Sequence, residues 1–175
     1  MGQKFPDITD SLKEFILKQK LFFVASAPMG RTGHVNISPK GYDTLRIISS
    51  TKLYYLDLTG SGVETVAHMK ENGRITLMWI SFEKMPQIVR VWGKGRAVEA
   101  GSEEYESLVD PKLKALPGAR AAIVVDVLMT GNSCGYSVPF FEFTGERTLL
   151  VDRAYKRVEN VSGTLAMIVR QGDEI

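Results

Sequence analysis

The sequence has only one cysteine, Cys134, and two histidines, His34 and His68, among its 175 residues. A single cysteine excludes an intrachain disulfide, which fits a reducing compartment. The two histidines and the cysteine do not lie at a recognisable metal-ligand spacing, so no zinc site is expected. The G-x-S-x-G, P-loop lysine and H-E-x-x-H motifs are also absent. The sequence therefore marks no nucleophilic or metal-dependent catalytic centre.

The sequence also has no large excess of charge of one sign and no long hydrophobic run. The formal net charge is +2 and no run of five like charges occurs, so neither nucleic acid nor a membrane is expected as a partner. No apolar run approaches the ~18 residues of a membrane span. The N-terminus lacks the apolar core of a signal peptide. We therefore expect a cytoplasmic protein.

Short apolar or alternating segments, separated by turn residues, predict six or seven strands with few helices between them. This pattern is typical of a mainly β fold with flanking helices, built as an antiparallel barrel. We expect residues 1–130 to form this domain. Residues 131–175 are expected to form a tail that packs on the barrel or on a partner subunit, with a loop from Gly131 to Pro139 and then short helices at 149–159 and 164–170. The expected strands are residues 21–25, 34–38, 45–49, 53–58, 74–82, 87–99 and 121–129.

One stretch, Leu53 to Gly73, reads as a strand, a glycine turn and a helix. The turn T-G-S-G cannot continue a strand, and helical spacing begins at Val63. A glycine turn that opens a helix leaves free backbone N–H groups, to which the helix dipole attracts an anion. The stretch is therefore either a phosphate site or a tight connection capped by hydroxyl side chains.

A second stretch, N-I-S-P-K-G, runs from Asn36 to Gly41. Asn36 and Ser38 share a strand face, and Lys40 follows at a Pro-Lys-Gly corner. An amide, a hydroxyl and a cation within one turn suit a phosphorylated or planar heteroaromatic ligand. The alternative is a charged surface turn.

The order of these segments resembles the pyridoxamine 5′-phosphate oxidase-like, FMN-binding split-barrel family. The resemblance runs from F-F-V-A-S-A-P through N-I-S-P-K-G and L-Y-Y-L-D-L-T-G-S-G-V-E-T to V-R-V-W-G-K-G-R-A-V-E. It covers about residues 21–99 and implies a split barrel. It also implies a homodimer, with FMN in two equivalent clefts between the subunits.

The resemblance assigns cofactor-binding roles to residues of both stretches. The corner at 36–41 would line the flavin, the turn at 59–65 would hold its phosphate and ribityl chain, and the loop at 134–139 would approach the cofactor. Arg90 would add positive charge near the phosphate. Glu64 departs from the family, in which many members carry Arg or Lys in this turn. The full set is Asn36, Ser38, Pro39, Lys40, Gly41, Thr59, Gly60, Ser61, Gly62, Glu64, Thr65, Arg90 and Tyr136.

The sequence therefore predicts an FMN-dependent oxidoreductase that acts on a small-molecule substrate or electron donor, with no catalytic residue assigned. Pyridoxamine phosphate oxidation itself is not expected, because the tail arginines Arg147, Arg153 and Arg157 are scattered and no histidine accompanies them. The alternative is a split-barrel protein that binds haem or another cofactor, with His34 or His68 as an iron ligand.

Overall fold

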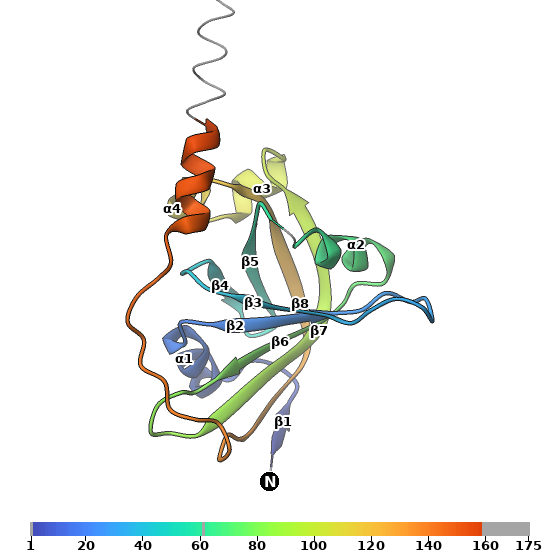
Figure 1. Cartoon of the computed structure of the whole chain (residues 1–175). Helices are drawn as coiled ribbons and strands as arrows, with labels where there is room; N and C mark the ends of the chain where they lie inside the picture. The colour runs from blue at the N-terminus through green and yellow to red at the C-terminus, as the bar shows by residue number, and fades with distance from the viewer. Residues whose placement is uncertain (1, 61, 159–175) are drawn as a thin grey trace, which may run out of the picture.

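A computed structural model describes residues 2–60 and 62–158, and it consists mainly of one antiparallel eight-stranded sheet (Figure 1). The strand order is β3–β2–β6–β7–β8–β5–β4, and β1 pairs with β8. Within the described residues β3 and β4 do not pair, so the sheet is not closed, and the predicted split barrel is confirmed. The strands are β1 (Gln3–Phe5), β2 (Phe22–Ser26), β3 (Asn36–Lys40), β4 (Leu45–Ser49), β5 (Lys52–Leu58), β6 (Arg74–Ile80), β7 (Gln87–Glu99) and β8 (Ala119–Cys134).

Short helices flank the sheet: α1 (Asp10–Lys18), α2 (Val63–Glu71), α3 (Glu103–Leu108), α4 (Pro111–Lys114) and a further helical segment in the tail, residues 149–158. The main core fills the barrel, where the side chains of Val24, Leu77 and Trp79 are almost fully buried. Helix α1 adds Leu12 and Ile16 to this core. A second apolar cluster lies beneath α3 and α4. In the described part of the chain, no helix is long and apolar enough to cross a membrane.

The predicted strand, glycine turn and helix are present as β5 and α2. The turn is tied to the start of β8, because the Thr59 N–H donates to the Gly118 carbonyl at 2.7 Å. Helix α2 then packs against β7, β2 and β6. Asn72 caps its C-terminus, and Gly73 follows with φ +70°, in the left-handed region that glycine adopts without a Cβ clash.

Strand β3 lies at the edge of the sheet and pairs only with β2, in a register that sets Pro39 opposite Phe23. Proline has no N–H to donate, so an edge position tolerates it. Along β3 the residues alternate between half-buried and exposed. Asn36, Ser38 and Lys40 therefore share one face, and Ile37 and Pro39 share the other.

The prediction that a loop begins at Gly131 is wrong for the first four residues, because β8 continues to Cys134. These small residues pair with β7 on one side, and Gly131 and Asn132 also pair with β1 on the other, so ladder hydrogen bonds extend the strand. Beyond β8 the tail runs back along one side of the barrel toward α4 (Figure 1). Residues 149–158 are helical, as predicted. The helix predicted at 164–170 lies outside the described residues.

Candidate functional site

The N-terminus of α2 is surrounded by charged side chains from three strands. Its N-cap residue, Gly62, is buried and has no side-chain cap among the described residues. A Cβ on Gly62 would lie 2.6 Å from Asp57 Oδ1, 3.3 Å from Arg120 Nη2 and 3.4 Å from Lys40 Nζ. The absence of a side chain at Gly62 therefore opens a small cradle between two cations and the first turn of the helix.

Asp57 and Arg120 form the fixed part of this cradle. The Asp57 carboxylate is 2% exposed and accepts a 2.6 Å hydrogen bond from Arg120 Nε. Arg120 Nη1 donates to the Gly60 carbonyl at 3.3 Å, which ties the guanidinium to the glycine turn. The remaining nitrogen, Nη2, is buried and has no hydrogen-bond partner within the described residues. The ion pair thus holds one guanidinium donor unpaired beside Gly62.

A second unpaired polar atom lies in the first turn of α2. Thr65 is 1% exposed, and its Oγ1 has no hydrogen-bond partner within the described residues. Buried polar atoms are nearly always hydrogen-bonded, so two orphaned atoms at one helix terminus need an explanation. An oxyanion would accept hydrogen bonds from both and from the free N–H groups of the helix. The donor set therefore fits a phosphate.

The face of β3 that carries Asn36, Ser38 and Lys40 completes the cluster. Ser38 Oγ donates to Asn36 Oδ1 at 2.8 Å, and Asn36 Nδ2 donates to Glu64 Oε2 at 2.5 Å. This chain of hydrogen bonds holds the Glu64 carboxylate against β3. Lys40 is half-buried, and burial lowers the pKa of its amine; Asp57 opposes this shift and Arg120 adds to it. Lys40 is therefore a partly desolvated cation rather than a solvated surface side chain.

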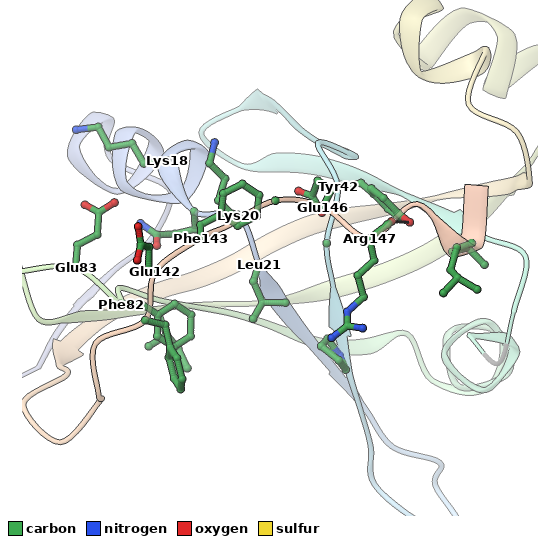
Figure 2. A pocket seen from close by; sticks show the side chains of 18 residues that line it. Lys18, Lys20, Leu21, Tyr42, Phe82, Glu83, Glu142, Phe143, Glu146 and Arg147 are labelled. Atoms are coloured by element: carbon green, nitrogen blue, oxygen red, sulfur yellow. Dashed lines mark hydrogen bonds between the residues drawn. The ribbon is translucent and has the colours of Figure 1, made fainter. Parts of the chain in front are cut away.

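The other residues of the two predicted stretches take different positions. The Thr59 hydroxyl donates to the Gly118 carbonyl at 2.9 Å, so it braces the turn. Ser61 lies outside the described residues. Pro39 and Gly41 line a separate cavity between β3 and the tail (Figure 2).

Arg90 and Tyr136 are not brought to α2 within this chain. Arg90 Nη1 donates to Ser133 Oγ at 3.2 Å, and Tyr136 is 83% exposed just beyond β8. On β7, Gly95 is the residue that faces Met69 of α2. Arg90 lies five residues earlier on that strand, or ~16 Å away at the rise of a β-strand. Their predicted cofactor roles thus find no support in the geometry of one chain, and they stay predictions.

The two histidines lie outside the cluster. His68 is on α2, and its Nδ1 is 2.9 Å from Ser26 Oγ. His34 is exposed in the connection between β2 and β3. Across residues 2–60 and 62–158, no group of three or more His, Cys, Asp or Glu side chains is arranged to hold a metal. The haem alternative stays an untested prediction.

Arg120 is the residue that the sequence interpretation missed. It follows the break at Pro117 and Gly118, where no local motif marks it, and its partner Asp57 lies 63 residues earlier. The signal that points to it is Asp57, the one polar residue in the apolar segment 53–58. A buried carboxylate requires a counter-charge, so a search for its cation leads to the neighbouring strand.

Comparisons with known proteins bear on the family and the fold. The family model described as pyridoxamine 5′-phosphate oxidase matches residues 8–131. The chain is 41% identical over 143 residues to the pyridoxamine 5′-phosphate oxidase family protein ustO of Aspergillus flavus. That alignment covers 80% of this chain and 57% of the relative, so the chain spans little more than half of that protein's length.

Two solved structures show the same fold. A variant of HupZ from Group A Streptococcus superposes with a TM-score of 0.59 and 23% identity, over 72% of this chain and 99% of that chain. A putative pyridoxamine 5′-phosphate oxidase from Lactobacillus delbrueckii gives a TM-score of 0.55 and 16% identity, over 72% and 94% of the two chains.

Proposed function

Because this chain belongs to the pyridoxamine 5′-phosphate oxidase family, we propose that it is a flavoprotein that binds FMN with the 5′-phosphate at the N-terminus of α2. The observation that carries the proposal is a pair of buried atoms beside Gly62, Arg120 Nη2 and Thr65 Oγ1, which have no hydrogen-bond partner within the described residues. A phosphate monoester brings close to two negative charges and three acceptor oxygens. It satisfies both atoms at once.

The charged side chains around the cradle balance, with Lys40 and Arg120 against Asp57 and Glu64. The attraction for an anion therefore comes from the α2 dipole and from the donors that have no partner within the described residues. The Asp57 carboxylate is occupied by Arg120, and the Glu64 carboxylate by Asn36. The two acids of the cluster are therefore held by protein partners and do not face the phosphate uncompensated.

FMN supplies hydride-transfer chemistry when bound, and on this proposal the protein is an oxidoreductase for a small-molecule substrate or electron donor. The residues around α2 bind and orient the cofactor. Lys40 Nζ contributes positive charge at the phosphate, and Thr65 Oγ1 donates a hydrogen bond to it. The Asn36–Ser38 pair fixes the β3 face against the helix.

We further propose that the protein is a homodimer, with FMN between the subunits. Large apolar side chains stay uncovered on this chain: Val35 is 67%, Ile37 65% and Leu128 64% exposed. Val35 and Leu128 line the same surface groove, and exposed apolar patches mark interfaces. The dimer should bury more than ~2,000 Å² of total surface, as obligate dimers do. Sedimentation velocity at micromolar concentration measures this, and a monomer contradicts the proposal.

Titration of flavin-free protein with FMN and with riboflavin tests the phosphate site. Arg120→Met should weaken FMN binding by roughly 10- to 100-fold, the range for losing a hydrogen bond to a charged group. Riboflavin, which lacks the phosphate, should bind the variant and the parent equally. Gly62→Ala should also weaken FMN, because its Cβ fills the cradle 2.6 Å from Asp57 Oδ1.

Arg31→Met is the matched control, since Arg31 is exposed in the connection between β2 and β3. It removes the same charge without touching the cradle. Equal FMN affinity in Arg120→Met, Arg31→Met and the parent protein would move the phosphate away from α2.

A further inference from the structure

A cavity of about 780 Å³ lies between the tail and the barrel (Figure 2). Lys40 does not line it, because the alternation of β3 puts the Lys40 side chain on the opposite face of the strand from Pro39. Pro39 and Gly41 form part of its wall. Its middle is apolar, with Leu21, Ile80, Phe82, Phe141 and Phe143 around it. The volume is in the range of sites that bind small organic molecules. The proposed phosphate site leaves this cavity unused.

Specific contacts hold the tail in place as one wall of the cavity. The Tyr42 hydroxyl donates to the Arg147 carbonyl at 2.5 Å. The rings of Phe82 and Phe141 meet edge to face, with centroids 5.2 Å apart. Lys20 Nζ lies 5.8 Å from the centroid of the Phe143 ring. The cavity is therefore built by side chains of the barrel that contact side chains and backbone of the tail.

Tyr42 carries a further sign of function. It is the one non-glycine residue of the described chain with a positive φ, at +62°. Such a backbone conformation is costly for a residue with a bulky side chain, and it persists where the surroundings impose it, often at ligand sites. Here it turns the chain just after β3 and brings the Tyr42 hydroxyl to the tail.

Charged groups lie at the two ends of the apolar middle. Figure 2 shows Glu83 and Glu142 together at one end, on the same side as Lys18 and Lys20, and the Arg147 guanidinium toward the other, on the side of Glu146. Within the described residues, none of these three side chains forms an ion pair. The lining as a whole contains three cations (Lys18, Lys20 and Arg147) and three acids (Glu83, Glu142 and Glu146). A lining of balanced charge, in which these two acids and Arg147 have no ion-pair partner within the described residues, favours a ligand that carries both charges over a simple anion or cation.

We propose that this cavity binds an elongated zwitterion with an aromatic or aliphatic body, its cationic end toward Glu83 and Glu142 and its anionic end toward Arg147. Strand β3 separates this ligand from the Lys40 cluster by the thickness of one strand. As a binding site the assignment stands by itself. As the substrate class of the flavoprotein it rests on the proposed function.

The probe is 4′-(aminomethyl)biphenyl-4-carboxylic acid, which has a biphenyl body with an amine at one end and a carboxylate at the other. Two analogues each keep a single charge: 4-(aminomethyl)biphenyl and biphenyl-4-carboxylate. Titration calorimetry on the full chain should give the tightest binding for the zwitterion, roughly three- to tenfold tighter than for either analogue.

Variants assign each end of the probe to its protein partner. Arg147→Met should weaken the zwitterion and the carboxylate by roughly three- to tenfold and leave the amine unchanged. The double variant Glu83→Gln, Glu142→Gln should weaken the zwitterion and the amine and leave the carboxylate unchanged. Arg153→Met is the control, because Arg153 is a tail arginine outside the cavity lining. It should change none of the three affinities.

Two results would overturn the inference. One is equal affinity for the three probes with no response to Arg147→Met. The other is displacement of the bound probe by FMN, which assigns the cavity to the flavin itself. FMN affinity is measured in a separate titration without the probe. Loss of flavin binding with intact probe selectivity therefore refutes the proposed function alone, and flavin binding without probe selectivity refutes the cavity assignment alone.

Discussion

The two faces of β3 differ in how their sites are built. On the α2 side, the groups that matter are buried: Asp57 is 2% and Thr65 1% exposed. On the tail side, the wall residues are open to solvent, with Phe141 66% and Phe143 53% exposed. The first site is fixed by strands of the barrel itself. The second depends on the tail, which follows the last strand. The Phe141 N–H of the tail donates a hydrogen bond to the Phe82 carbonyl of the barrel at 3.4 Å.

This difference determines where the free energy of unfolding and ligand affinity depend on the same side chains. Groups on the α2 side are part of the folded core, so changing them alters both the free energy of unfolding and ligand affinity. Groups on the tail side contribute little to folding, so changing them alters mainly ligand affinity. Four measurements test this contrast.

Asp57→Ala should give the largest effect. It leaves the guanidinium of Arg120 partly buried without its carboxylate, which costs about 2–3 kcal/mol of unfolding free energy, below the cost for a fully buried pair because Arg120 is 30% exposed. Urea denaturation measures it. The control is Asp43→Ala, which breaks an ion pair whose acid is 88% exposed and should cost ~1 kcal/mol or less. Equal losses of unfolding free energy in the two variants would show that the Asp57–Arg120 pair contributes no more to stability than an exposed ion pair.

Thr65→Val should act in opposite directions on stability and on binding. The nearly isosteric change removes a buried hydroxyl that has no partner in the described structure, so flavin-free protein should gain about 1 kcal/mol. FMN should bind more weakly by about 1.5–3 kcal/mol, since a hydrogen bond to a charged phosphate is lost. A destabilised variant with unchanged FMN affinity would show that the hydroxyl has a structural partner and no ligand.

The pH dependence of FMN affinity tests Lys40. Burial lowers the pKa of Lys40 in the free protein, and a bound phosphate should raise it again by favouring the charged amine. Affinity should therefore be highest below the lowered pKa and fall as pH rises through it, toward the ordinary lysine value of 10.5.

The titration starts from about pH 7, where the phosphate is already close to a dianion. Lys40→Met should abolish the pH dependence in this window. Riboflavin is the control for ionisation of the ring that both ligands share. A Lys40→Met protein with the pH profile of the parent would assign the titration to another group.

Phe141→Ala should give the smallest effect on stability. Its ring is 66% exposed and makes one edge-to-face contact with Phe82, so the loss should be about 0.5–1 kcal/mol. Binding of the biphenyl zwitterion should nevertheless fall, because the ring forms part of the wall. A large loss of stability, measured by thermal denaturation, would make the tail an integral part of the core.

Local sequence patterns were sufficient for much of the site. Two glycines and a change of hydrophobic period defined β5, the turn and α2, because these signals act within a few residues. The alternation of β3 placed Asn36, Ser38 and Lys40 on one face for the same reason. Glu64, which stands where many family members carry Arg or Lys, is held by Asn36, which lies 28 residues away in sequence and adjacent in space.

Features that depend on distant parts of the chain could not be predicted. Arg120 meets Asp57 only because β8 pairs with β5. Strand β1 has three residues, and its pairing with the far end of β8 defines it more than its own pattern does. The cavity requires the tail to fold back beside Tyr42, an arrangement that no pattern within the tail encodes.

The alternation of β3 also determines which kinds of sequence change the two sites tolerate. A substitution at Pro39 or Lys40 alters one site and leaves the other intact, because neighbouring residues face opposite sides. An insertion or deletion of one residue within β3 has a different result, since it turns the side chains that follow to the other face. Lys40 would then face the tail cavity and a neutral neighbour would face α2. The two binding specificities can therefore diverge independently through point mutations, whereas a single frame-preserving codon insertion in this strand disables both.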